Sequence, residues 1–240
     1  MSWFEKWFDS SYYHLLYKNR DKKEAQVFIN KLITHLKIPR NSKILDVACG
    51  KGRHSVYFNK KGMDVVGIDL SINSIESAKK EENSRLQFHK HDMRKIFRKN
   101  YFDIVTNLFT SIGYFESDED EQNAINAMAL NLKQDGILVI DFMNVKKVIK
   151  QLVKYEVKTV DEVNFKIRRK VINNFIIKSI GLSENKKHYQ FQEKVKALTL
   201  TNFAQYIKNA DLKIINIFGN YRLENFDELT SERLIIICKK

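Results

Sequence analysis

The feature that most restricts how this chain can fold is the alternation of short apolar runs with amphipathic segments in its first 140 residues. Apolar runs predict strands at 43–47, 64–68, 86–89, 102–106 and 137–140, and helical patterns occupy 22–36, 53–61, the segment from Ser71, and 117–132. Parallel neighbours need a long crossover, usually a helix, whereas antiparallel neighbours can be joined by a two-residue turn. The alternation therefore predicts an α/β domain built on a mostly parallel sheet with helices on both faces.

The pattern changes after about Val153 into long strands separated by polar breaks. These strands are predicted at 164–172, 174–182 and 187–198, with Asn173–Asn174 as a hairpin turn, and a helix at 201–210 and strands at 212–218 and 233–238 follow. We interpret the middle strands as an antiparallel β insertion before the last strands of the main sheet. The same pattern also fits a continuation of one large mixed sheet.

The composition limits the broad class of protein. Of the 240 residues 43% are hydrophobic, which is enough for a real core, and no apolar run approaches the roughly 20 residues of a membrane helix. The first 21 residues lack the apolar core and small-residue cleavage site of a secretory signal. The two cysteines, Cys49 and Cys238, show no metal-ligand spacing. We therefore expect a cytoplasmic protein with reduced thiols and no metal site.

The chain is strongly basic, with 42 Lys and Arg against 29 Asp and Glu, a net charge of +13. A basic surface attracts nucleic acid or an acidic small substrate. The charges are, however, spread along the whole chain without the dense block of a basic arm, which favours lysine as an ordinary solubilising residue. A nucleic-acid partner therefore stays open as the less favoured interpretation.

A Gly-x-Gly turn, Gly50-Lys51-Gly52, lies directly between the first predicted strand and the helix that follows it. Glycine lets a chain turn sharply and lets its backbone approach a ligand without a Cβ in the way. The first turn of the next helix offers free N–H groups to an anionic group. This motif predicts a cofactor site, but alone it also fits a nicotinamide enzyme.

Three details separate these possibilities. Asp46 lies at the end of the first strand, where a carboxylate would repel a pyrophosphate but suit a ligand that carries positive charge. The third glycine of the dinucleotide fingerprint is absent, because Arg53 and His54 follow Gly52. Asp69 ends the second strand, where a ribose-binding carboxylate is expected. The details favour a cofactor other than a dinucleotide.

The run from Ile44 to Ser55 resembles motif I of the class I S-adenosylmethionine-dependent methyltransferases. Gly67 to Ser71 resembles their second motif, and His91-Asp92-Met93 resembles the segment that reads adenine. The resemblance implies a Rossmann-like, mostly parallel seven-stranded sheet, S-adenosyl-L-methionine as cofactor, and methyl transfer as the reaction. The cofactor-binding residues that it implies are Asp46, Ala48, Cys49, Gly50, Gly52, Asp69, Leu70, Asp92, Met93 and Asn107.

The resemblance also implies a role for most of these residues. Asp46 and the loop 50–52 would hold the methionine end, and Asn107 would line it. Asp69 would bind the ribose hydroxyls. Leu70 would pack on adenine, with Met93 beside it, and Asp92 would accept a hydrogen bond from the adenine amino group. Cys49 is itself interpreted as a small buried residue in a tight turn.

The aromatic N-terminal segment resembles the lid that folds over the cofactor in small-molecule methyltransferases of similar layout. By that resemblance Tyr17 and Arg20 would reach the cofactor carboxylate, which an arginine can grip through two hydrogen bonds. The alternative is that Trp3, Trp7 and Phe8 simply pack on a sheet. Both interpretations remain open from the sequence.

The sequence indicates much less about the methyl acceptor than about the cofactor. Ligands of open parallel sheets lie at the carboxyl ends of the strands, so the loop 107–115 is expected to face the transferred methyl group. Tyr114 in this loop is the candidate catalytic residue, as a base or a positioning group, although core packing explains it equally well. Asp141 and Asn144 end the fifth strand and are further candidates for lining the pocket.

The sequence favours a small-molecule methyltransferase that acts on an oxygen or nitrogen atom. An RNA methyltransferase is the alternative, but the Asn/Asp-Pro-Pro-aromatic run of exocyclic-amine enzymes is missing after Asn107, and no cysteine suits cytosine-carbon chemistry. A non-catalytic cofactor-binding protein is the third possibility. We expect a lid and first helix at 1–38, the cofactor core at 39–152, a β insertion at 153–199 as pocket wall or dimer contact, and the end of the core sheet at 200–240, in a monomer or homodimer.

Overall fold

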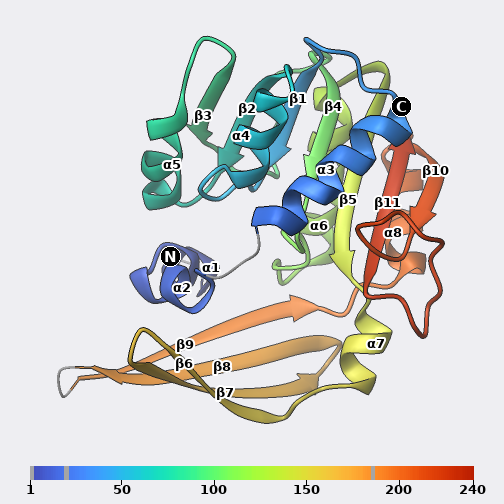
Figure 1. Ribbon diagram of the computed structural model, residues 1–240. Helices are drawn as coiled ribbons and strands as arrows, with labels where there is room; N and C mark the ends of the chain where they lie inside the picture. Colours follow the sequence, from blue (N-terminus) through green and yellow to red (C-terminus); the bar gives the residue numbers. More distant parts are fainter. Residues whose placement is uncertain (1–2, 19–21, 185–186) are drawn as a thin grey trace.

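The computed structural model describes residues 3–18, 22–184 and 187–240, which form two β-sheets with helices around them (Figure 1). The larger sheet has the strand order β10-β11-β5-β4-β1-β2-β3. From β3 to β5 neighbouring strands are parallel, whereas β11 runs antiparallel to both β5 and β10. This confirms the predicted mostly parallel seven-stranded sheet. Its strands are β1 (Lys43–Val47), β2 (Asp64–Asp69), β3 (Leu86–Lys90), β4 (Phe102–Asn107), β5 (Leu132–Met143), β10 (Lys213–Phe218) and β11 (Arg233–Lys239).

Helices cover both faces of this sheet, as predicted. One core joins α3 (Lys22–Leu36), α4 (Arg53–Lys60) and α5 (Ile72–Ala78) to one face, and the other face packs against α6 (Asp118–Asn131) and α8 (Leu200–Asn209). Within β1, Ile44 belongs to the first core and Leu45 to the second, because successive side chains of a strand point to opposite faces. Ser71 and Ser117 cap α5 and α6 through their hydroxyl groups.

The smaller sheet is separate and antiparallel, with the order β6-β7-β8-β9. Its strands are β6 (Tyr155–Val160), β7 (Val163–Ile172), β8 (Phe175–Glu184) and β9 (Lys187–Lys196), and α7 (Val145–Lys150) leads into it. The hairpin between β7 and β8 turns at Asn173 and Asn174, which both have positive φ, as the prediction required. The structure thus confirms the predicted β insertion and excludes the alternative of one large mixed sheet. The strand β6 and the helix α7 were not predicted.

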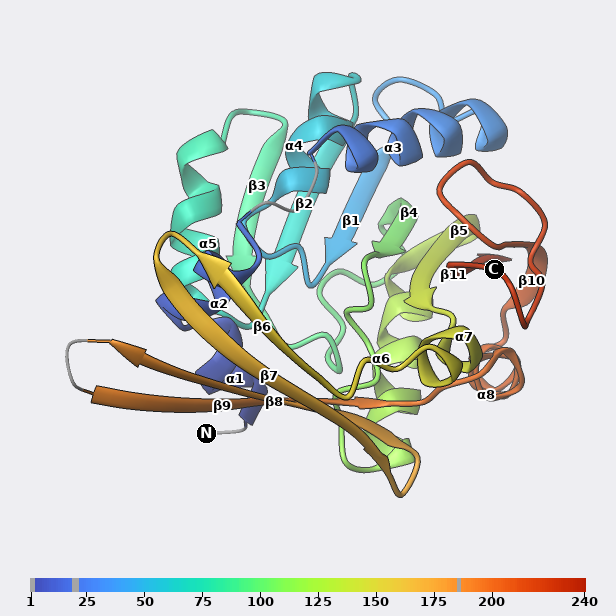
Figure 2. The same cartoon turned by 60° about the horizontal axis from the view of Figure 1, so that its bottom comes forward.

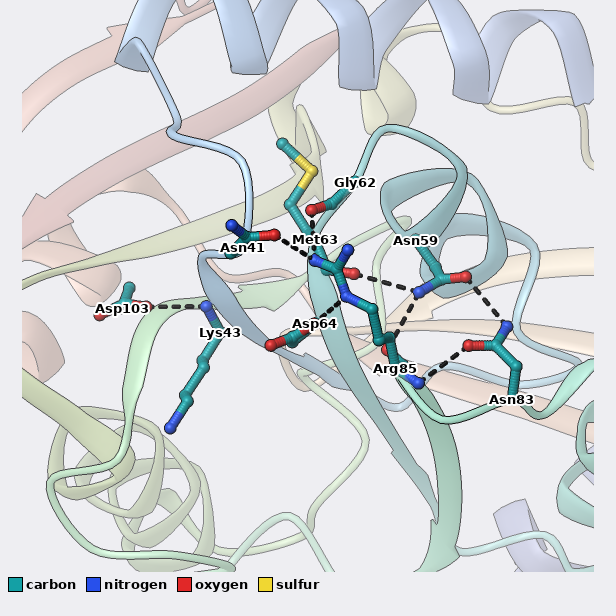
Figure 3. A network of polar contacts seen from close by, with 9 residues as sticks. All are labelled: Asn41, Lys43, Asn59, Gly62, Met63, Asp64, Asn83, Arg85 and Asp103. Atoms are coloured by element: carbon teal, nitrogen blue, oxygen red, sulfur yellow. Dashed lines mark hydrogen bonds and ion pairs between the residues drawn. The ribbon is translucent and has the colours of Figure 1, made fainter.

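A network of polar contacts closes the edge of the main sheet where its parallel strands begin (Figure 3). Arg85 pairs with Asp64 at the start of β2 and donates from Nη2 to the Gly62 carbonyl at 2.6 Å. The backbone N–H of Lys43, at the start of β1, donates to Asp103 Oδ2 at 2.7 Å. These pairings occupy the amino-terminal edge with structural contacts, so the carboxyl edge is the place for a ligand.

Two short helices, α1 (Trp3–Phe8) and α2 (Ser11–Leu16), lie between the carboxyl edge of the main sheet and the second sheet (Figures 1 and 2). Trp7 and Leu16 are buried in a third core with Phe165 and Ile180 of the second sheet. The predicted N-terminal helical segment is therefore sandwiched between the sheets. Among the described residues, no helix has the length and apolar character to cross a membrane.

Candidate functional site

A cavity of about 450 Å³ lies at the carboxyl edge of the main sheet. The loops after β1, β2, β3 and β4 line one side of it, and α1 and α2 line the other. Of the residues predicted to bind a cofactor, the lining includes Ala48, Cys49, Gly50, Asp69, Leu70, Asp92, Met93 and Tyr17. Asp46, Gly52 and Asn107 do not line it, and Arg20 lies outside the described residues.

Gly50 and Asp69 meet at the centre of this edge. The Gly50 N–H donates to Asp69 Oδ2 at 2.8 Å, and the Ser71 N–H donates to Oδ1 at 2.8 Å. Gly50 has φ +56°, and a Cβ built on it would meet no atom within 4 Å. Burial raises the pKa of the Asp69 carboxyl above its usual value. The two residues therefore present a carboxylate beside an open space that a ligand can fill, with lone pairs left to accept hydroxyl protons.

Asp46 lies behind the cavity wall and not in it. Its buried carboxylate accepts from Ser55 Oγ at 2.6 Å and from Thr106 Oγ1 at 3.0 Å. Burial raises its pKa to about 6. The expected contact of Asp46 with the methionine end is not what this geometry shows. Because its side chain lies within the layer between β1, α4 and β4, it braces the strand from which the glycine turn departs.

Two glycines make room for the turn instead of touching the cavity. A Cβ on Gly52 would lie 2.6 Å from the Phe88 ring, and one on Gly67 would lie 2.8 Å from Cys49 Sγ. Since real Cβ atoms do not approach so closely, both positions require glycine for packing. Cys49 is buried, as interpreted from the sequence, and burial raises the pKa of its thiol.

The side of the cavity formed by the loops after β2 and β3 is lined by both apolar and charged side chains. Leu70 and Met93 line it. Asp92 lines it too, but Arg94 Nη2 donates to Asp92 Oδ2 at 2.6 Å, and Arg94 also pairs with Asp120 at 3.1 Å. From the resemblance, Asp92 was expected to accept a hydrogen bond from the ligand. The structure instead places Arg94 in the cavity with it, so that any ligand amino group shares this carboxylate with a guanidinium.

Asn107 ends β4 just behind the lining. Its Nδ2 donates to the Val47 carbonyl at 3.2 Å, and its buried Oδ1 has no hydrogen-bond partner among the described residues. A buried acceptor without a partner costs about 1–3 kcal/mol.

The loop after β4 depends on a buried ion pair that sequence reasoning missed. The Phe109 N–H donates to Asp141 Oδ2 at 2.8 Å, and Arg233 Nε donates to Asp141 Oδ1 at 2.7 Å. Phe109 and Thr110 have φ of +65° and +59°, which non-glycine residues adopt rarely. Asp141 therefore does not line the pocket, as had been suggested for it, but holds the strained loop that does. Asn144 likewise binds backbone carbonyls of Glu228 and Ser231 outside the cavity.

Glu121 holds the rest of this loop. Its buried carboxylate accepts from the N–H groups of Gly113 at 3.0 Å and of Phe115 at 3.1 Å. Burial raises its pKa to about 7. Tyr114, the candidate catalytic residue, lines the cavity with its ring, while its hydroxyl donates to the Thr110 carbonyl. No sequence signal distinguished Glu121 from the neighbouring acids of α6.

The N-terminal helices are tied to both sheets. Ser71 Oγ donates to Asp9 Oδ1 at 2.6 Å, which attaches the turn between α1 and α2 to the start of α5. Tyr17, at the end of α2, donates to Glu193 Oε1 of the second sheet at 2.6 Å, and Trp7 Nε1 donates to the same oxygen at 2.8 Å. Tyr17 thus lines the cavity, but its hydroxyl is directed to the second sheet, and its expected contact with a cofactor carboxylate stays a prediction.

Comparisons with known proteins agree with this architecture. Residues 44–136 match the family model described as a methyltransferase domain. A dTDP-3-amino-3,4,6-trideoxy-alpha-D-glucopyranose N,N-dimethyltransferase of Streptomyces venezuelae is 33% identical over 103 residues, 43% of this chain and 43% of the relative. A glycine/sarcosine N-methyltransferase of Aphanothece halophytica is 30% identical over 146 residues, 58% and 52% of the two chains. The chain spans about half the length of these curated relatives.

Solved structures extend the likeness of fold over the whole chain. An S-adenosylmethionine-dependent methyltransferase from Clostridium acetobutylicum superposes with a TM-score of 0.81 at 19% identity, covering 95% of each chain. A sugar N-methyltransferase from a Streptoalloteichus species gives a TM-score of 0.74 at 20% identity, covering 95% and 92%. The second sheet and the N-terminal helices thus belong to a fold that other proteins share.

Proposed function

We propose that the chain belongs to the class I S-adenosylmethionine-dependent methyltransferase superfamily, which the methyltransferase-domain match at residues 44–136 supports, and that it transfers a methyl group from S-adenosylmethionine to an oxygen or nitrogen atom of a small molecule. The observation that carries the proposal is the junction of Gly50 and Asp69. Its carboxylate faces a cavity of about 450 Å³ at the carboxyl edge of a parallel sheet.

Residues on the cavity side of β2 and β3 suit the nucleoside. Asp69 keeps lone pairs on both oxygens after its two backbone contacts and would accept from the two ribose hydroxyls. Leu70 and Met93 would pack on the faces of adenine, and Asp92 would accept from its amino group in competition with Arg94. The carboxylate of Asp69 would suit the ribose of a nicotinamide dinucleotide as well. The missing third glycine of the dinucleotide fingerprint, with Arg53 and His54 after Gly52, disfavours that cofactor.

Residues around the glycine turn suit the methionine end. Gly50 leaves open space for it, and Ala48 and Cys49 line the same stretch of wall. Asn107 lies behind the lining and would act through the position of β4. Arg53 also lines the cavity, with its guanidinium carbon 4.5 Å from the centre of the Phe109 ring, and it supplies a cation for the carboxylate. Asp46 would act through the position of β1.

Methyl transfer requires alignment and the exclusion of water more than a dedicated catalytic group. When bound, the cofactor supplies a methyl carbon that is already electrophilic on its sulfonium. The protein contributes a strained loop at Phe109 and Thr110, held by Asp141, that places the acceptor. The helices α1 and α2 line the cavity from the other side and would reduce its access to water when ligands are bound.

An RNA acceptor is the second candidate, because Lys166, Arg168 and Lys170 alternate along the exposed face of β7 and the net charge is +13. These side chains lie on the face of the second sheet that is turned away from its buried core. Cofactor chemistry would take place under α1 and α2, so this basic face does not lead to the cavity. RNA affinity that falls steeply with added salt, together with methylation of that RNA, would favour this candidate instead.

The test is a titration calorimetry experiment with S-adenosylhomocysteine and, in parallel, with NADH. We expect one site per chain for the thioether and no heat from the dinucleotide. Transfer of labelled methyl groups to a panel of small molecules then separates an enzyme from a non-catalytic binding protein. Absence of binding at millimolar S-adenosylhomocysteine, or preferential binding of NADH, would overturn the proposed function.

A further inference from the structure

We propose that the methyl acceptor is a planar, largely apolar molecule whose attacking atom is the oxygen of an ionised phenol-type hydroxyl; this rests on the proposed function. The inference comes from one side of the cavity, which we call the aromatic wall. It consists of cavity-lining rings from α1, α2, the end of α2 and the loop after β4, namely Phe4, Phe8, Tyr13, Tyr17, Tyr114 and Phe115.

The rings of the aromatic wall form two contacting groups, which are joined through Trp3 at 5.6 Å from Phe4 and 5.7 Å from Tyr114 between ring centres. Phe8 contacts Tyr13 at 5.0 Å and Tyr114 at 5.2 Å between ring centres. Tyr13 contacts Tyr17 at 5.1 Å, and Phe4 contacts Phe115 at 6.0 Å. Offset and edge-to-face contacts at 4.5–7 Å are the favourable geometries of aromatic pairs. A flat acceptor would add one more ring to an arrangement that already has this geometry.

Two tyrosines of the wall direct their hydroxyl groups away from it. Tyr17 donates to Glu193 Oε1 at 2.6 Å, and Tyr114 donates to the backbone carbonyl of Thr110. Each hydroxyl is thereby occupied by a protein acceptor, and what remains for the cavity is the ring. The wall is therefore less polar than its residue types suggest.

Few polar groups accompany these rings on the same elements. Among the described residues that line the cavity from α1, α2 and the loop after β4, the other polar side chains are His14, Lys18 and Ser111. Lys18 pairs with Asp161, and Ser111 Oγ donates to the Leu108 carbonyl at 2.8 Å. A sugar or an amino acid would bury several hydroxyl or charged groups here, at about 1–3 kcal/mol for each one left without a partner. A planar apolar acceptor avoids that cost.

Charge decides the nature of the attacking group. The cavity lining carries four basic side chains of Lys or Arg, Lys18, Lys51, Arg53 and Arg94, and two carboxylates, Asp69 and Asp92. Lys18 and Arg94 also pair with Asp161 and Asp120, which lie outside the lining, so these protein charges balance. The sulfonium of the bound cofactor is then the cation that would oppose a protonated amine and stabilise an anion, and it would lower the pKa of a bound phenol. An ionised hydroxyl also removes the need for a catalytic base.

The proposed step balances without any other reactant. The phenol proton leaves to water as the acceptor binds. The phenolate oxygen then forms a bond to the methyl carbon while the methyl–sulfur bond breaks, and that bonding pair remains on sulfur as the neutral thioether. The products are an aryl methyl ether and S-adenosylhomocysteine.

The test uses the full chain saturated with S-adenosylhomocysteine and measures the binding of small probes by calorimetry. We expect 4-nitrophenol and catechol to bind at least about tenfold more tightly than glucosamine or glycine, and 2-phenylethylamine, which has a ring but a cationic amine, to bind as weakly as these. Tight binding of glucosamine, glycine or the aryl amine would overturn the inference. Failure to bind S-adenosylhomocysteine would instead contradict the proposed function, so the two failures are distinguishable.

Variants of one wall residue sharpen the test. Tyr114→Leu removes a ring, and we expect the affinity for 4-nitrophenol to fall about tenfold while the affinity for S-adenosylhomocysteine stays within twofold. Tyr114→Phe keeps the ring and should recover most of that loss. The matched control is Tyr155→Leu on the exposed face of β6, where the side chain is 51% exposed. If Tyr114→Phe loses as much affinity as Tyr114→Leu, the hydroxyl and not the ring binds the acceptor, and the inference is wrong.

Discussion

The two sheets of this protein are buried in different ways and contribute to the site in different ways. Every residue of β11 between its ends is buried, whereas buried and exposed residues alternate along β7. The main sheet is covered on both faces, so its polar groups appear where strands end, and these ends carry Asp69 and Asn107. The second sheet has one buried face, which holds α1 and α2 against the cavity. The main sheet thus carries the loops that line the cavity, and the second sheet positions the helices α1 and α2.

Each region also contains one ion pair removed from solvent. Arg233 and Asp141 of the main sheet have 16% and 1% of their side chains exposed, and Lys178 and Glu193 of the second have 13% and 15%. The first pair supports the loop at Phe109, and the second supports Tyr17. Disrupting the first pair should therefore lower the free energy of unfolding more than disrupting the second, because the carboxylate of Asp141 has no access to water.

Arg233→Met should give the largest effect. The substitution removes the guanidinium and leaves the Asp141 carboxylate buried with only neutral donors, so we expect a loss of about 4 kcal/mol in the free energy of unfolding, measured with urea. Lys239→Met removes the exposed Lys239–Asp135 pair from the same strand and should cost less than about 1 kcal/mol. Equal losses in the two variants would remove the distinction between the regions.

Asp69→Ala should weaken cofactor binding by at least about 100-fold, because two hydrogen bonds to a charged acceptor are lost at about 1.5–3 kcal/mol each. Calorimetry with S-adenosylhomocysteine measures the affinity, and circular dichroism checks the fold. Asp64→Ala, at the other end of β2, removes a carboxylate of the amino-terminal edge and should leave the affinity unchanged. An unaltered affinity in Asp69→Ala would eliminate the ribose assignment.

Glu121→Gln should flatten the dependence of stability on pH. Burial raises the pKa of Glu121 from the ordinary 4.5 to about 7, so between these values the folded chain binds more protons than the unfolded chain, and stability falls as pH rises. Between pH 5 and pH 7 this group should lower the free energy of unfolding of the wild type by about 2 kcal/mol, and we expect the variant to lack that decrease. Urea unfolding at several pH values measures it. Glu119→Gln, exposed on the same helix, is the control. A wild-type slope in Glu121→Gln would refute the raised pKa.

Glu193→Ala should have the smallest effect, about 1–2 kcal/mol on unfolding, because its ion pair retains some access to water. It should nevertheless loosen α1, since Trp7 loses its acceptor. Both tryptophans of the chain, Trp3 and Trp7, lie in this helix, so the wavelength of tryptophan emission reports on it directly. We expect a red shift in this variant. The control is Glu232→Ala, which removes an exposed carboxylate that pairs with Lys147, and it should give no shift. If Glu193→Ala gives no red shift, Glu193 does not hold the helix.

Much of the fold could be predicted because its elements are locally encoded. The strand at 43–47 and the helix at 22–36 were predicted with the bounds that the structure shows, since continuous apolar runs and helical periodicity need no knowledge of neighbours. The strand β6 was missed because its sequence, YEVKTV, is mostly exposed: Val160 is its one buried residue, and Val157 is 51% exposed. Its assignment depends on pairing with β7, which no local pattern reports.

The site was predictable where the motif itself makes the contact. Gly50 and Asp69 lie 19 residues apart and are joined by a hydrogen bond, as the strand-turn-helix pattern requires. By contrast, Arg94 covers Asp92, and Arg233 reaches Asp141 across 92 residues. A spacing of 92 residues carries no periodicity that a sequence pattern could reveal.

The sequence by itself determined the parallel sheet, the glycine turn and the acid that ends β2, because strand and helix periodicity and the backbone freedom of glycine act over a few residues. Only the tertiary structure decided that Asp46 faces Ser55 and Thr106 instead of the cavity, and that the hydroxyl groups of Tyr17 and Tyr114 are bonded to protein acceptors. The direction of a polar side chain is set by which donors and acceptors long-range packing brings within about 3 Å. That choice is made between segments far apart in the chain.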